Sequence, residues 1–369
     1  MRAFIPVFAL IAGFAFLAAD LGAQNRGDFF SLQRRVVELF EDNKDALVRV
    51  KAVYEAEDGD DTPQMVVGSG FFISREGLIL TNASIAYDPV RLWIEHRDIA
   101  YSADLIGADR ATNLALLRVN TLPKSFRFLH LADSADIPPI GNFVIRISMP
   151  LEFSPTPEWG LVSGHESRFG DRSFPTLYIR TSIPAGPGDG GSAYLDLNGR
   201  LVGIQVGSLP DIGSSYILPS RAALRIRDDL LFNQEVNYGW IGFEIREEIS
   251  IAEGKRVVLT EVFEDSPADR AGLLAGDVIL KIGDYSVATL DELRNAMFYT
   301  RVGQYSEVHV ERDGERLRLN IRVAQRPDDE PLEVVEERND FQPGYSDGPL
   351  RRPVEEESVL EAESVESSE

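Results

Sequence analysis

The residues with the clearest capacity for chemistry lie in a glycine-rich segment, GPGDGGSAYLDLNGRLVGIQ, which runs from Gly186 to Gln205. Its only serine is Ser192, and a serine beside Gly-Gly is more often a turn hydroxyl than a nucleophile. A serine nucleophile needs a base such as histidine within reach. The histidines of the chain are widely scattered, and none falls in or near this segment. They are His96, His130, His165 and His309. The segment therefore offers one hydroxyl without an evident base to activate it.

The same segment resembles the nucleophile region of HtrA (DegP-like) serine proteases, which reads NPGNSGGALVNLDGEVIGI. The Pro-Gly pair at Pro187 and Gly188 matches the family, and so does the downstream strand and turn. The matched downstream positions are Ala193, Leu197, Gly199, Gly203 and Ile204, with Val202 as a conservative change. In this register the nucleophile position is Gly190, which has no side-chain oxygen to attack a carbonyl. Using Ser192 instead requires a two-residue shift that destroys the flanking matches.

Two further segments resemble the regions that hold the other members of the family's Ser/His/Asp triad. GSGFFISREGLILTNASIA, from Gly68 to Ala86, reproduces the frame around the general base, and Ser84 stands at the histidine position. DRATNLALLRV, from Asp109 to Val119, reproduces the frame around the orienting aspartate, and Asn113 stands there. No lysine lies within these motifs to act as an alternative base.

All three triad positions are thus replaced, and we expect no proteolysis above background, since loss of Ser or His alone costs on the order of a million-fold in turnover. The resemblance implies that one part of the catalytic site, the oxyanion hole, is retained. The backbone N–H groups of Gly188 and Gly190 would still form the oxyanion hole, where a peptide carbonyl could bind without being cleaved.

A second segment, Glu264 to Ala296, resembles PDZ domains of bacterial proteases, whose hallmark reads SPAxxAGLxxGDxI. Such domains bind a C-terminal peptide as an added strand and hold its carboxylate with backbone N–H groups. The resemblance implies a carboxylate-binding loop at Trp240-Ile241-Gly242-Phe243 and a groove that selects an apolar C-terminal side chain. The residues expected to bind peptide are Trp240, Ile241, Gly242, Phe243, Ile245, Leu293 and Met297.

The N-terminus has the pattern of a secretory signal peptide, with Arg2, an apolar run from Phe4 to Ala19 and small residues near Ala23. An uncleaved anchor is the alternative, because Leu21 is awkward three places before that cut. Either form predicts export to the periplasm or the outside of the cell. The chain has no cysteine, which excludes disulfides, thiol catalysis and Cys-ligated metals. The histidines lack ligand spacing, so we expect neither a metal nor another cofactor.

The chain is acidic, with a formal net charge of -23, which argues against nucleic acid or an anionic membrane as a partner. Nearly half of this excess lies from Arg326 onward, where 15 acidic residues against 4 basic ones give -11. This tail is rich in Pro, Glu and Ser and poor in apolar residues, so it is expected to be disordered.

Short apolar runs separated by Gly, Pro, Asn and Asp turns predict a mainly β protein. The expected fold is a trypsin-like double six-stranded β-barrel followed by a small α+β PDZ domain. An amphipathic stretch from Phe29 to Glu41 is expected to be helical, packing on the barrel or on another subunit. The expected organisation is a signal peptide (1–23), an N-terminal helical segment (24–45), a pseudoprotease domain (46–219), a linker helix (220–237), a PDZ domain (238–325) and an acidic tail (326–369).

Three functions fit these observations. The first is a non-catalytic HtrA-like pseudoprotease that binds C-terminal peptides or unfolded proteins through its PDZ domain, as a scaffold, regulator or quality-control factor in the cell envelope. The second is an active serine endopeptidase with an atypical nucleophile such as Ser192. The third is a holdase chaperone. HtrA-like proteins are commonly trimers, so a homotrimer and an active HtrA relative are the further expected partners.

Overall fold

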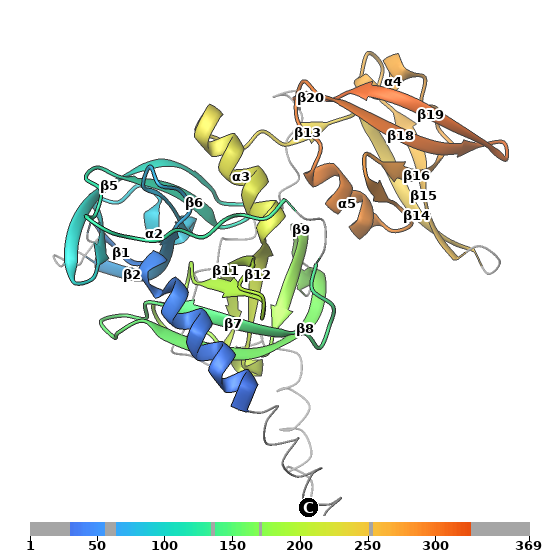
Figure 1. Ribbon diagram of the computed structural model, residues 1–369. Coiled ribbons are helices and arrows are strands. Elements are labelled where there is room, and N and C mark those ends of the chain that lie inside the picture. Colours follow the sequence, from blue (N-terminus) through green and yellow to red (C-terminus); the bar gives the residue numbers. More distant parts are fainter. Residues whose placement is uncertain (1–29, 56–63, 134–136, 170–171, 251–253, 326–369) are drawn as a thin grey trace, which may run out of the picture.

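The structure is a computed structural model that describes residues 30–55, 64–133, 137–169, 172–250 and 254–325 (Figure 1). The proposed signal peptide and the acidic tail lie outside the described residues. Two closed six-stranded barrels stand side by side, and a separate sheet with two short helices follows them. The predicted fold class is therefore confirmed. No helix among the described residues is long and apolar enough to cross a membrane.

The first barrel closes in the order β1-β2-β3-β6-β5-β4. Its strands are β1 (Leu47–Tyr54), β2 (Gln64–Phe72), β3 (Leu78–Asn82), β4 (Arg91–His96), β5 (Ile99–Asp109) and β6 (Leu114–Val119), with a one-turn helix, α2 (Ala83–Ala86), after β3. Its interior is filled by branched and aromatic side chains such as Val50, Phe72 and Ile94, each fully buried. β3 and α2 carry the segment around Ser84 directly from this core to the surface.

The second barrel closes in the order β10-β11-β12-β9-β8-β7. Its strands are β7 (Phe143–Ser148), β8 (Thr156–Phe169), β9 (Arg172–Thr181), β10 (Ala193–Leu195), β11 (Leu201–Leu209) and β12 (Ser214–Pro219). The glycine-rich loop that contains Gly190 therefore connects β9 to β10. A larger apolar cluster joins the two barrels, and it includes Phe71 from the first and Ile204 from the second.

Residues 30–43 form a helix that packs on the barrels of its own chain. Leu39 is buried in the cluster between the barrels, and Val36 and Phe40 are half-buried against it. This packing agrees with the predicted amphipathic helix and shows an intramolecular contact with the barrels; a contact with another subunit stays a prediction. Phe30 and Val37 remain exposed on the other side of the helix.

Helix α3 (Ser220–Asn233) follows the second barrel and leads to the third unit, whose sheet has the order β14-β15-β16-β18-β19. The elements of this unit are β13 (Gly239–Trp240), β14 (Phe243–Ser250), β15 (Gly254–Val262), α4 (Pro267–Ala271), β16 (Val278–Ile282), β17 (Tyr285–Ser286), α5 (Leu290–Phe298), β18 (Tyr305–Arg312), β19 (Glu315–Arg322) and β20 (Ala324–Gln325). Short 3-10 helices also occur before β1 and between β11 and β12, and these are η1 (Lys44–Ala46) and η2 (Pro210–Ile212).

The PDZ-like hallmark has a clear structural basis. The Ser266 hydroxyl accepts the Asp269 N–H and caps α4, with Pro267 at the first helical position. Gly272 ends the helix in the left-handed conformation, at φ 83°. Asp277 is buried and accepts two bonds from Arg312, at 2.6 and 2.7 Å. The hallmark residues therefore shape the turn that delivers the chain into β16.

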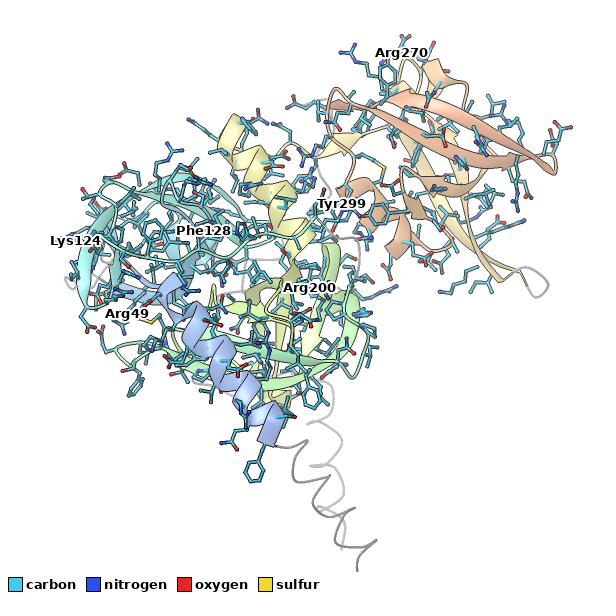
Figure 2. All side chains as sticks on the ribbon, viewed as in Figure 1. Arg49, Lys124, Phe128, Arg200, Arg270 and Tyr299 are labelled. Carbon is cyan, nitrogen blue, oxygen red and sulfur yellow. The ribbon has the colours of Figure 1, made fainter. Side chains whose placement is uncertain are left out.

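The third unit docks on both barrels. Asn295 of α5 accepts bonds from the Thr176 hydroxyl and the Leu177 N–H of β9, at 2.7 and 3.2 Å. At the start of the unit, the Tyr238 hydroxyl donates to Asp109 of the first barrel at 2.8 Å. Tyr299, at the end of α5, lies where the unit meets the barrels (Figure 2). A cavity of about 190 Å³ opens there, away from the triad positions.

Candidate functional site: a vacated triad and a peptide groove

The three positions at which the resemblance places a catalytic triad, Ser84, Asn113 and Gly190, lie together at the junction of the two barrels. The Asn113 side-chain oxygen accepts the Ser84 backbone N–H at 2.9 Å, and the Asn113 carbonyl accepts the Ala83 N–H at 3.1 Å. The Asn113 amide group donates to the Val206 carbonyl of β11 at 2.8 Å. Asn113 has φ 58°, a left-handed conformation that asparagine tolerates better than most residues. Asn113 thus ties the turn around Ser84 to the second barrel.

Gly190 faces the side chain of Asn82, two residues before Ser84. A Cβ atom added at Gly190 would lie 2.8 Å from Asn82 Nδ2 and 3.8 Å from Ile85 Cδ1. A serine at this position would require the Asn82 side chain to move. Asn82 is almost fully buried, and neither its Nδ2 nor its Oδ1 has a hydrogen-bond partner among the described residues. The space beside Gly190 is therefore occupied by the Asn82 amide, whose NH2 group has no hydrogen-bond acceptor among the described residues.

The loop from Gly186 to Ser192 is held in a defined conformation. The Asp189 N–H donates to the Gly186 carbonyl at 3.2 Å, and Gly188 at the turn has φ 83°. Ser69 of β2 donates its hydroxyl to the Gly188 carbonyl at 2.8 Å. Neither the Gly188 nor the Gly190 N–H donates a hydrogen bond within the described part of the chain. An oxyanion hole at these two N–H groups stays a prediction.

Ser192 is buried inside this loop. Its hydroxyl donates to the Asp189 carbonyl at 2.5 Å, and its exposed fraction is 1%. This is the geometry of a turn hydroxyl. The histidines lie elsewhere: His96 Nε2 faces the Asp45 carbonyl, and His165 Nε2 faces the Pro138 carbonyl. Burial lowers the pKa of the His96 imidazole, so that side chain favours its neutral form.

Sequence reasoning missed a buried polar network beside Gly190. The Arg146 guanidinium of β7 pairs with Asp189 at 3.0 Å and also with Glu158. It donates to the Pro184 carbonyl at 2.7 Å and to Gln205 at 3.1 Å. Only 2% of Arg146 is exposed. The sequence did contain a signal for this network, namely the arginine inside the apolar run FVIRIS. An arginine is almost never fully buried without a partner, so its place in such a run predicts a buried ion pair.

The same network extends into the barrel through Tyr194, whose hydroxyl lies 3.2 Å from Gln205 Oε1 and 2.7 Å from Ser215 Oγ. Burial raises the pKa of the Tyr194 phenol, and Arg146 and its hydrogen bonds oppose this effect without cancelling it. The phenol therefore stays protonated and serves as a structural donor.

The peptide groove of the third unit is predicted to lie between β14 and α5. β14 is an edge strand of its sheet, so its outer side can pair with an added strand. Phe243, Ile245 and Met297 are half-buried and supply the accessible apolar surface. Ile241 and Leu293, with 1% and 5% exposed, lie beneath them in the core.

The loop that precedes β14 is shaped by Gly242, at φ 92°. A Cβ atom there would lie 2.3 Å from Ser266 Cβ, so only glycine fits without a shift. Trp240 stacks on Phe263, with ring centroids 6.1 Å apart, and fixes the other side of the loop. All the residues expected from the sequence thus belong to this loop, the edge strand or the facing helix.

Comparisons with known proteins agree with this architecture. Residues 68–204 match the model of a trypsin-like peptidase domain, and residues 239–323 match the model of a PDZ domain. The chain is 30% identical over 291 residues to a "Probable periplasmic serine endoprotease DegP-like" of Marinomonas sp. (strain MWYL1), covering 74% of this chain and 60% of the relative. A relative of the same name from Ectopseudomonas mendocina (strain ymp) is 29% identical over 71% of this chain and 57% of the relative. The chain thus spans about 60% of the length of these relatives.

Among solved structures, "HtrA-type protease AlgW with tripeptide" is 26% identical, with a TM-score of 0.62 over 79% of this chain and 97% of that chain. The serine endoprotease from Yersinia pestis shares the fold, with a TM-score of 0.54 and 23% identity. Fold and site together define a trypsin-like peptidase-fold protein with a PDZ domain. The matched domain models, the DegP-like relatives and the solved structures make this chain similar to HtrA-type proteases.

Proposed function

We propose that this chain is a non-catalytic member of the HtrA family that binds the C-termini of peptides or proteins through its PDZ domain. The observation that carries the proposal is the vacated triad. Gly190, Ser84 and Asn113 supply no nucleophile, no general base and no carboxylate, and Asn82 fills the space beside Gly190. The Asn113 hydrogen bonds with Ser84 and Val206 link the two barrels at these positions, which is a structural role.

The alternative of an active endopeptidase rests on Ser192, and its surroundings disfavour that role. A nucleophilic hydroxyl must be accessible and hydrogen-bonded to a base. Ser192 is buried, and its hydroxyl donates a hydrogen bond to the Asp189 carbonyl instead. Fluorophosphonate labelling and casein digestion of the full chain and of Ser192→Ala test this point. We expect neither labelling nor digestion, whereas labelling that disappears in Ser192→Ala would refute the proposal.

Peptide capture is supported by the unpaired edge of β14 and the half-buried apolar side chains beside it. The test is fluorescence anisotropy with a peptide that ends in an apolar residue, as a free acid and as the C-terminal amide. We expect amidation to weaken binding at least tenfold, because the loop at Gly242 binds the carboxylate through backbone N–H groups. Equal affinities for the two forms would refute capture of C-termini.

We further propose that the protein works in the cell envelope, as a scaffold, regulator or quality-control factor. The relatives are named as periplasmic endoproteases, and the N-terminal sequence has the pattern of an export signal. The exposed Phe30 and Val37 on the N-terminal helix offer a contact for a homotrimer or for an active relative. Light scattering of the purified chain, alone and mixed with an active relative, distinguishes these assemblies.

A further inference from the structure

The outer face of β19 carries three arginines. Side chains of a strand alternate between the two faces of its sheet, and Leu317, Leu319 and Ile321 of β19 pack on the PDZ core. Exposed arginines on the opposite face form a surface that we call the arginine face, and they are Arg316, Arg318 and Arg322. β19 is the edge strand opposite β14 in the sheet order, and its hairpin turn with β18 points away from the barrels (Figure 1).

The arginine face is not neutralised by carboxylates of its own sheet. None of its three guanidinium groups forms an ion pair within the part of the chain that the structure describes, where the PDZ domain pairs its carboxylates with other cations. On the neighbouring strand β18, Glu311 stands opposite Arg316 in the register without an ion pair to it. Glu307 pairs with His309 instead. Lys281 of β16 stands opposite His309 and adds a further positive charge.

An acidic segment of the same chain begins within reach of the arginine face. Residues 328–337, DDEPLEVVEE, contain six acidic residues and no basic one. They begin three residues after Gln325, which ends β20. Six steps of about 3.4 Å separate Arg316 from Arg322, so the arginine face is about 20 Å long. Ten extended residues span up to about 34 Å, which is enough to pass all three arginines.

The spacing of the acidic residues fits the spacing of the arginines. The chain leaves β19 beside Arg322, so a segment that passes along the strand must turn back and run antiparallel to it. Four steps separate Arg322 from Arg318, and four separate Asp329 from Glu333. The next arginine stands two steps further along β19, and the next acidic residue stands three steps after Glu333. Carboxylates can therefore meet all three guanidinium groups.

From these observations we propose that the arginine face of β19 binds the chain's own acidic segment, residues 328–337. The short connection gives an effective concentration on the order of millimolar, so exposed ion pairs that are individually weak suffice. The bound segment covers the outer surface of β18 and β19. The inference goes beyond peptide capture and does not rest on it, because β14 forms the opposite edge of the sheet.

Disulfide trapping tests where the acidic segment lies, since the chain has no cysteine of its own. Asn320→Cys places a thiol on the arginine face, and Leu332→Cys places one in the acidic segment. In the control pair, Glu244→Cys on the exposed part of β14 replaces Asn320→Cys. At low salt and low protein concentration, maleimide labelling should show oxidation of the first pair at least about fivefold faster than of the control pair. This difference should vanish at about 1 M salt, where the Debye length is about 3 Å.

Charge variants test whether the arginines hold the segment. Changing all three arginines of the face to Gln should reduce the oxidation rate to that of the control pair, and the fold should persist because these side chains are exposed. Arg246→Gln on β14 is the matched control and should leave the rate unchanged. A neutralised-tail chain should behave like the triple arginine variant. Its substitutions are Asp328→Asn, Asp329→Asn, Glu330→Gln, Glu333→Gln, Glu336→Gln and Glu337→Gln.

A free DDEPLEVVEE peptide tests whether the face is occupied in the parent chain. The peptide is acetylated and amidated, so the carboxylate loop proposed for C-terminal capture has no chain end to bind. Fluorescence anisotropy should show binding to the neutralised-tail chain at least about fivefold tighter than to the parent chain, because the tethered segment competes.

Four results would overturn the inference. Equal oxidation of the two cysteine pairs would show that the segment does not dock on β19. A faster rate that neither salt nor the triple arginine variant lowers would reflect chain connectivity alone. Equal peptide binding by the parent and neutralised-tail chains would leave the face open to another acidic molecule. Disulfides between chains that increase with protein concentration would assign the bound segment to a second copy.

Discussion

Removal of the Arg146 charge should destabilise the second barrel strongly while leaving the PDZ domain unchanged. Arg146 and Asp189 are a buried pair, with 3% and 6% of their side chains exposed. In Arg146→Met the methionine fills the space, but Asp189 keeps only the Gly186 N–H as a donor, at 2.8 Å. Breaking a buried pair by removing one partner typically costs about 3–5 kcal/mol. For a urea dependence of about 2–3 kcal/mol per M, the unfolding midpoint should fall by about 1–2 M.

Asp189→Asn should be milder, with a cost of about 1–2 kcal/mol. The asparagine keeps an oxygen for the Gly186 N–H, and Arg146 keeps its pairing with Glu158. The double variant Arg146→Met with Asp189→Asn should be more stable than Arg146→Met alone, because it leaves no buried charge unpaired; Glu158 also loses Arg146, but its side chain is partly exposed to water.

The assay is urea denaturation followed by circular dichroism. Fluorescence of Trp240, in a background with Trp93 and Trp159 changed to Phe, reports the PDZ domain and should show an unchanged midpoint. An Arg146→Met variant within 1 kcal/mol of the parent would refute the reasoning. So would a double variant no more stable than Arg146→Met.

Three further predictions address the Asn113 hydrogen bond to the second barrel, the dependence of stability on pH and the docking of the PDZ domain on the barrels. Asn113→Asp should cost about 1–3 kcal/mol in urea denaturation, because a carboxylate cannot donate to the Val206 carbonyl; unchanged stability would contradict this. Burial lowers the pKa of His96 below its ordinary 6.5, so the unfolded chain binds a proton at His96 more readily than the folded chain does. Stability should be full above about pH 6.5 and fall as the pH drops through 6.5 toward the folded-state pKa, and His96→Gln should abolish this slope in urea midpoints measured from pH 7.5 to 5. Asn295→Ala removes the acceptor for the Thr176 hydroxyl and the Leu177 N–H, so the radius of gyration from small-angle scattering should increase; an unchanged value would show that the other contacts hold the PDZ domain in place.

The sequence alone was sufficient for the fold class, and it also predicted three positions for a replaced triad. Turn residues and apolar runs are local signals, and they specify strands and helices such as α4 and α5 directly. Ser84, Asn113 and Gly190 could be located because each lies within a segment whose flanking residues match a family pattern. The PDZ hallmark was equally legible, since residues such as Ser266 and Gly272 act within one helical turn of their partners.

Several long-range contacts of this chain became visible only in its tertiary structure. Arg146 meets Asp189, Asn82 faces Gly190, and Glu247 reaches the Leu290 N–H, which is 43 residues away. The PDZ domain docks through pairs even further apart, such as Asn295 with Thr176, separated by 119 residues. No local period or motif encodes such pairings, because they depend on how closed barrels and sheets bring distant strands together. The sequence by itself determined which residues stand at the positions where the resemblance places a triad, and the packing of distant residues decided that Asn82 lies beside Gly190 and that Asn113 bonds to the second barrel.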